Sequence, residues 1–140
     1  MRETLDDVRG QTLRAGVVSE RGPWTERKDG GASGIEVELI QRFAARLGAN
    51  VSWTWGGEQG LIERLERREL HVVAAGFDDS SPWSEQVGMT RPYFESEEAS
   101  DRTVRHVLAV PPGENAWLRQ LELFLRQERG RVSQQYGRMR

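Results

Sequence analysis

Residues 34–48 show the clearest alternation of apolar and polar side chains in the sequence. The apolar positions fall on one stripe of a helix with 3.6 residues per turn, and charged residues occupy the opposite side. Gly48 stands where a left-handed residue commonly ends a helix. The pattern therefore predicts a helix with one buried face, formed by Val37, Ile40, Ala44 and Leu47 together with Leu39 and Phe43.

Short apolar runs lie on both sides of this helix. Residues 13–18 and 51–55 are typical of strands, and a strand, helix and strand in succession need a parallel, right-handed crossover. Residues 70–75 are almost continuously apolar, as expected of a parallel strand that is covered on both faces. This order predicts an α/β fold: a doubly wound, mostly parallel open sheet with helices on both faces.

The remaining segments have weaker patterns. A shorter helix is expected around residues 61–65, and a final helix from residue 114 onwards. Glycine and proline in residues 19–33 predict a long loop. Residues 95–103 are acidic and poor in apolar side chains, which predicts a short connector, and residues 104–110 predict another strand. All of this fits one domain over residues 1–140.

Composition excludes several classes of function. The 20 basic and 22 acidic residues nearly balance, so there is no overall positive field for nucleic acid. The absence of cysteine excludes disulfides, thiolate metal sites and cysteine nucleophiles. The first residues are too acidic for a signal peptide, so we expect a cytoplasmic chain as expressed.

Polar and aromatic residues follow the carboxyl ends of the predicted strands. In doubly wound sheets ligands bind at this edge, which here is formed by residues 19–24, 55–57 and 76–83. Tryptophan rings there could stack on a ligand, and the aspartate and serine side chains could accept hydrogen bonds. Packing under loops and turn formation are the competing explanations. The candidate ligand-binding residues are Glu20, Trp24, Trp55, Gly76, Phe77, Asp78, Ser80, Ser81 and Trp83.

Other chemistry has little support. The adjacent carboxylates Asp78 and Asp79 lack the spacing of a metal loop or an acid–base pair. His71 and His106 lack partners at metal-ligand spacing and are expected to be structural. No glycine-rich phosphate loop is present, so we expect neither a metal nor a cofactor.

Several segments occur in an order that resembles a known family. Residues 34–39, 72–76 and 91–94 resemble bacterial extracytoplasmic solute-binding proteins of the amino-acid transporter type, family 3. The likeness covers residues 12–95 and returns at residues 106–110 and in the final helix. It implies a periplasmic or extracytoplasmic protein that binds a small polar molecule, such as an amino acid or another amine or carboxylate, and presents it to a membrane transporter.

The sequence departs from this family in two places. Members have two lobes, and the second is inserted after the proline–tyrosine segment, but here residues 95–106 alone join Phe94 to Val107. We therefore expect the first lobe only. Members that bind amino acids also carry an arginine after the third strand that holds the ligand carboxylate, and Trp83 stands at that position.

The resemblance favours a non-enzymatic solute-binding domain whose binding is weak or lost, because half of the ligand contacts are missing. Two alternatives remain: a reduced or engineered scaffold without a ligand, and a dehydratase-like enzyme that uses Glu20, Asp78 or Asp79. The uncovered cleft face could also join two copies of the chain as a homodimer.

Overall fold

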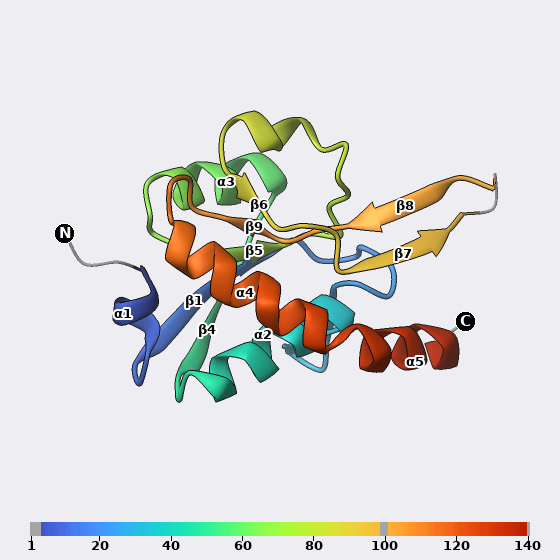
Figure 1. The fold of residues 1–140 in the computed structure, drawn as a ribbon, viewed down its shortest axis with the longest axis horizontal. Helices are drawn as coiled ribbons and strands as arrows, with labels where there is room; N and C mark the ends of the chain where they lie inside the picture. Colours follow the sequence, from blue (N-terminus) through green and yellow to red (C-terminus); the bar gives the residue numbers. More distant parts are fainter. Residues whose placement is uncertain (1–3, 99–100, 140) are drawn as a thin grey trace.

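The computed structural model describes residues 4–98 and 101–139, which form one α/β unit around a mixed sheet (Figure 1). Strand β1 is central and pairs in parallel with β4 and β5. Strand β9 runs antiparallel to both of its neighbours, β5 and β6. The order across the sheet is β4 (Asn50–Trp55), β1 (Thr12–Val17), β5 (Val72–Ala74), β9 (Ala109–Val110) and β6 (Gly88–Met89).

Helices cover both faces of this sheet, as the sequence predicts. Side chains of α2 (Ile35–Arg46) and α4 (Asn115–Gln127) form one core with Leu13 and Ala15 of β1. Side chains of α3 (Glu58–Glu66) form a second core on the other face with Val73 of β5. The helices α1 (Thr4–Val8) and α5 (Arg129–Met139) lie at the two ends of the chain.

The predicted helix over residues 34–48 is α2, and its apolar stripe is buried. Gly34 precedes it with φ at +119°, and a Cβ atom there would collide with the carbonyl group of Trp24. Gly48 follows it in the left-handed region, with φ at +65°. Glycine is therefore needed at the start of this helix and suits its end.

Residues 95–103, expected as a connector, begin and end in strands, because 95–97 belong to β7 (Phe94–Glu97) and Thr103 belongs to β8 (Thr103–His106). An antiparallel ribbon of β7 and β8 projects from the body of the protein (Figure 1). One pair of opposite charges lies across the ribbon, since Glu95 is directly opposite Arg105. The strand expected over residues 104–110 is therefore divided between β8 in the ribbon and β9 in the sheet.

Two segments expected as loops contain short elements. Residues 19–33 include an antiparallel hairpin of β2 (Glu26–Lys28) and β3 (Gly31–Ser33). The loop after β5 contains a single 3₁₀ turn, η1 (Pro82–Glu85), which is capped by the side chain of Ser81. In the residues that the structure describes, no helix has the length and apolar character needed to cross a bilayer.

Candidate functional site

Three side chains meet where the parallel strands end. Arg21 lies in the loop after β1, Glu58 is the first residue of α3 after β4, and Trp83 lies in η1 after β5. We call Arg21, Glu58 and Trp83 the half-cleft cluster. The carboxyl ends of parallel strands meet at one edge of a sheet, which is where open α/β folds bind ligands.

Glu58 is the centre of this cluster. One of its oxygens, Oε2, lies 2.7 Å from an Nη atom of Arg21, and the other, Oε1, accepts a hydrogen bond of 2.8 Å from Nε1 of Trp83. The side chains of Arg21 and Glu58 are 40% and 30% exposed, respectively. The edge therefore presents a cation and an anion side by side, both within reach of solvent.

A second carboxylate, Glu36 at the start of α2, fixes the backbone below this cluster. Its oxygens accept hydrogen bonds from the N–H of Gly76, at 3.0 Å, and from the hydroxyl of Tyr93, at 2.7 Å. Glu36 is fully buried, and burial raises its pKa to about 7 against the opposing effect of these hydrogen bonds. Glu36 thus joins the loop after β5 to the segment that leads into β7.

Trp24 and Phe77 do not lie at the rim of the cleft, where the sequence places them. The Trp24 side chain is 9% exposed, and its ring stacks on Tyr136 of α5 at 5.5 Å and lies 3.8 Å from the ring of His106. Phe77 is 5% exposed and belongs to the core beneath α3. The loops that carry both residues turn these rings inward, because burial of an aromatic ring stabilises the fold.

The polar residues after β5 bond mainly to one another. Asp78 accepts hydrogen bonds from the N–H and the hydroxyl of Ser80, while Ser81 Oγ accepts one from the N–H of Trp83. The Ser80 hydroxyl bond contributes most to lowering the pKa of Asp78, so this carboxylate is ionised at neutral pH. These contacts are those of a turn, and they also position Trp83.

The other two candidates lie beside the half-cleft cluster rather than within it. Trp55 ends β4 half-buried, and the guanidinium of Arg27 lies over its ring at 5.0 Å. Glu20 is exposed in the loop after β1, with φ at +63°. Gly76 contributes its backbone, since a Cβ atom there would come within 3.1 Å of the Arg21 side chain.

Both histidines are buried. His71 Nδ1 accepts a hydrogen bond of 2.9 Å from the N–H of Arg14, and His106 Nε2 lies 2.7 Å from the hydroxyl of Ser96. Burial lowers the pKa of each to about 4, so both rings are neutral at pH 7. Across residues 4–98 and 101–139, no three histidine or carboxylate side chains are placed to hold a metal ion.

Sequence reasoning missed Arg21 and Glu58. Arg21 lies within the predicted cleft segment 19–24, and Glu58 is one residue beyond segment 55–57. Opposite charges after two neighbouring parallel strands are the signal that could have found them. Charged residues are common in surface loops, however, so the pairing becomes clear only when the two loops are seen side by side.

This sheet and the helices that cover it form a single lobe of the periplasmic-binding-protein type of α/β fold. Residues 13–133 match the model of the bacterial extracellular solute-binding proteins, family 3. The chain belongs to this family.

One relative is the "Probable histidine-binding protein" of Campylobacter jejuni, which is 25% identical over 85 residues. The match covers 61% of this chain and 33% of that protein, so the chain spans about a third of its relative.

Solved structures show the same fold at lower identity. The arginine-bound form of domain 1 of the T. maritima protein TmArgBP superposes with a TM-score of 0.76 at 20% identity, covering 91% of this chain and 99% of that one. An ancestral amino-acid-binding protein, a precursor of cyclohexadienyl dehydratase, superposes with a TM-score of 0.82 at 15% identity, covering 99% of both chains.

Proposed function

We propose that this chain is a solute-binding lobe that takes a free amino acid at the half-cleft cluster. The observation that carries the proposal is the position of Glu58, which holds Arg21 and Trp83 together at the carboxyl edge of the sheet. An α-amino acid brings one carboxylate and one ammonium group. The Arg21 guanidinium suits the carboxylate as a two-pronged donor, and Glu58 suits the ammonium group.

The cluster favours a cationic or aromatic side chain on the ligand. The Trp83 ring is half-buried beside Glu58 and offers a face on which a guanidinium or imidazole can stack. Two similar proteins point the same way, one being an arginine-bound domain and the other a probable histidine-binding protein. Arginine and histidine are therefore the first ligands to test.

We expect the affinity to be low. The ligand must separate Arg21 from Glu58, which are already in contact at 2.7 Å, and a single lobe supplies only one side of a cleft. Both effects act against the free energy of association, so a Kd on the order of 1 mM is expected. Such a lobe would act outside the cytoplasmic membrane together with a transporter, as is characteristic of the family.

Binding without catalysis fits the acids at this edge better than a dehydratase activity does. Asp78 is held ionised by Ser80, which makes it a poor proton donor near neutral pH. Glu20 is exposed, and no other side chain orients it among the described residues. A cleft that moves protons needs an acid and a base held towards the substrate, and this edge instead offers a fixed cation and anion.

The test is an NMR titration of ¹⁵N-labelled protein with arginine and histidine. We expect saturable shifts of the Trp83 indole N–H and of backbone amides near Gly76.

Arg21→Ala and Glu58→Gln should each weaken binding about tenfold, since each removes a charge-assisted contact, whereas Arg119→Ala on the exposed side of α4 should not. Agmatine, which lacks the carboxylate of arginine, should bind as poorly to the wild type as arginine binds to Arg21→Ala. Shifts confined to other regions, or equal affinities for all variants, would refute the assignment.

A second copy of the chain is a further proposed partner for this edge. The support is charge complementarity rather than apolar area, because the large apolar side chains exposed in the described residues are Leu123 and Met139, on α4 and α5. Sedimentation velocity should then show dimers that dissociate at high salt. A monomer at all concentrations and salt levels would remove this partner.

A further inference from the structure

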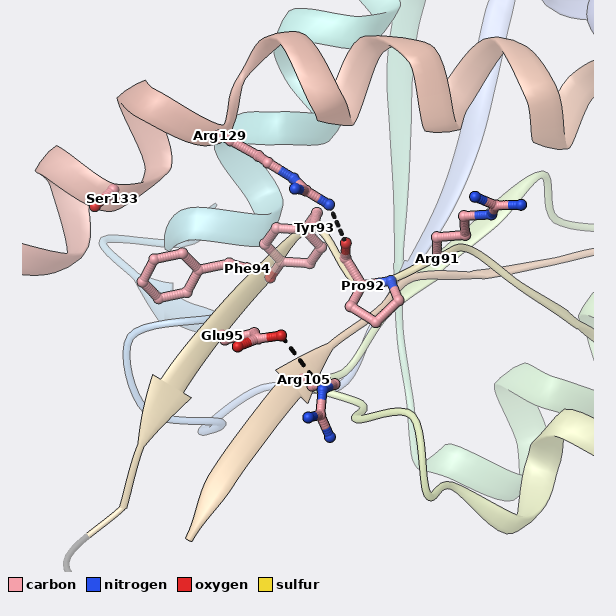
Figure 2. A pocket seen from close by; sticks show the side chains of 8 residues that line it. All are labelled: Arg91, Pro92, Tyr93, Phe94, Glu95, Arg105, Arg129 and Ser133. Atoms are coloured by element: carbon pink, nitrogen blue, oxygen red, sulfur yellow. Dashed lines mark hydrogen bonds and ion pairs between the residues drawn. The ribbon is translucent and has the colours of Figure 1, made fainter. Parts of the chain in front are cut away.

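A cavity lies away from the half-cleft cluster, between the β7–β8 ribbon and the start of α5 (Figure 2). Its volume is about 530 Å³, within the range of small-molecule sites. None of the three residues of the half-cleft cluster lines it. We call it the ribbon pocket; its lining residues are Arg91, Pro92, Tyr93, Phe94, Glu95, Arg105, Arg129 and Ser133.

The lining of the ribbon pocket is positively charged. Three of the residues are arginines and one is a glutamate, and that glutamate, Glu95, already pairs with Arg105 at 3.3 Å. Within the described part of the chain, the Arg91 guanidinium contacts no acceptor or acid, although its backbone N–H bonds to Glu122. Among the described residues neither Arg91 nor Arg129 forms an ion pair, and the lining has more arginines than carboxylates, which favours an anion.

Arg129 is placed to hold such an anion. One Nη atom donates a hydrogen bond of 3.1 Å to the carbonyl oxygen of Pro92, and this contact orients the guanidinium over the pocket (Figure 2). The other N–H groups have no acceptor among the described residues. A guanidinium anchored at one corner can present two parallel N–H groups to a carboxylate without further loss of side-chain freedom.

The rest of the pocket is suited to an apolar body. Pro92, Tyr93 and Phe94 are consecutive residues of the lining (Figure 2), and the rings of Pro92 and Phe94 are partly exposed. The Tyr93 hydroxyl is turned inward to Glu36 and its side chain is buried, so Pro92 and Phe94 provide the accessible rings. Flat rings in a partly enclosed pocket favour an aromatic or planar ligand.

We infer that the ribbon pocket binds a small aromatic carboxylate, with the carboxylate on Arg129 and the ring against Pro92 and Phe94. This site is separate from the half-cleft cluster in position and in chemistry. The half-cleft cluster offers a cation and an anion for a zwitterion, whereas the ribbon pocket offers unneutralised arginines and rings for an amphipathic anion. The two sites can therefore be tested independently.

The test is ¹⁹F NMR of 4-fluorobenzoate in the presence of the protein. We expect saturable line broadening with a Kd on the order of 1–10 mM, as befits a partly open pocket. The isosteric cation 4-fluorobenzylamine should bind at least about tenfold more weakly, because the arginines repel it. Inorganic phosphate, which has charge but no ring, should compete only weakly.

Variants separate this pocket from the rest of the surface. Arg129→Gln should weaken 4-fluorobenzoate binding about fivefold to tenfold, whereas Arg138→Gln, an exposed arginine on the same helix, should leave it unchanged. Ser133→Trp keeps all three arginines and fills the cavity from an exposed helix position, so it should abolish binding while the fold is retained. Arg21→Ala, which removes the carboxylate-binding cation of the half-cleft cluster, should have no effect on 4-fluorobenzoate binding.

Three results would overturn the inference. They are equal binding of 4-fluorobenzoate and 4-fluorobenzylamine, full binding by the folded Ser133→Trp variant, and loss of binding in Arg21→Ala. The last result would place 4-fluorobenzoate in the half-cleft cluster instead.

Discussion

Two glutamates in this lobe have similar partners and opposite surroundings. Glu36 accepts hydrogen bonds from the Tyr93 hydroxyl and from the N–H of Gly76, and Glu58 accepts one from the Trp83 indole and pairs with Arg21. Each carboxylate therefore joins one aromatic donor to one further group near the carboxyl edge of the sheet. Glu36 is fully buried, however, while the Glu58 side chain is 30% exposed.

This difference in exposure indicates different roles for the two glutamates: one stabilises the structure of the edge, and the other is available to a ligand. The groups that donate hydrogen bonds to Glu36 are uncharged. Burial therefore disfavours the ionised carboxylate, and the pKa of Glu36 rises to about 7. Its contacts are too enclosed for exchange with a ligand. Glu58 has a cation beside it and water within reach, so its contacts can be exchanged at little cost. We infer that Glu36 shapes the edge and that Glu58 meets the solute.

The largest expected effect is the pH dependence of Glu36→Gln. The folded pKa of Glu36, about 7, lies above its ordinary pKa of 4.5, so the folded state holds this proton more tightly than the unfolded state does. The contribution of Glu36 to stability is therefore complete below pH 4.5 and is lost as the pH rises to about 7. The free energy of unfolding of the wild type should fall by about 3 kcal/mol relative to Glu36→Gln over this interval.

Urea unfolding of both proteins from pH 4.5 to pH 8 measures this change. His71 and His106, whose lowered pKa values remove stability as the pH falls from 6.5 towards 4, are present in both proteins and cancel in the difference. Glu66→Gln, at an exposed position of α3, is the matched control and should track the wild type. A constant difference between wild type and Glu36→Gln would contradict the account of Glu36.

The next effect is that of Tyr93→Phe, which removes one hydrogen bond to the buried carboxylate and little volume. A loss of about 1–3 kcal/mol in the free energy of unfolding is expected. Because the Tyr93 hydroxyl lowers the pKa of Glu36, the loss should be greater at pH 8 than at pH 4.5. Combining Tyr93→Phe with Glu36→Gln should give less than the sum of the two effects. Strict additivity would mean that the hydroxyl and the carboxylate are not coupled.

The smallest effect on stability should come from Glu58→Gln. The Arg21–Glu58 pair is partly exposed, and the amide oxygen can still accept from the Trp83 indole. Thermal or urea unfolding should therefore change by less than about 1 kcal/mol, even though arginine binding is expected to fall sharply. A loss of more than about 2 kcal/mol would place Glu58 with Glu36 as a structural residue.

The fold was largely predictable because its main elements have regular patterns. Val37, Ile40 and Ala44 give α2 a clear helical period, and the continuous run that contains Val72 and Val73 marks a strand covered on both faces. The ribbon was not predictable in this way. Its strands carry charges such as Glu95 and Arg105, which resemble a solvated connector until they are seen to pair across the two strands.

The sequence predicted where the candidate site lies on the sheet, but only some of the residues that form it. The rule that ligands bind beyond strand carboxyl ends selected the edge of the sheet where the half-cleft cluster lies, and it included Trp83. The rule could not show which rings turn inward, and Trp24 is buried against Tyr136 and His106, residues far from it in the sequence. The helical period predicts that Glu36 faces solvent. In the structure Glu36 is fully buried, because Tyr93 and Gly76, from segments distant in the sequence, pack over it and donate hydrogen bonds to it.

The ribbon makes this lobe a modular unit. The two strands are paired from Phe94 and His106 out to Glu97 and Thr103, and the N–H of Glu98 bonds to the carbonyl of Arg102, so the chain leaves and returns at neighbouring points. Folded domains often have neighbouring termini and are tolerated as insertions at exposed turns. A whole domain could therefore be gained or lost at this one position without altering a strand of the main sheet, which makes the ribbon tip a natural place to graft a sensor or a second binding lobe.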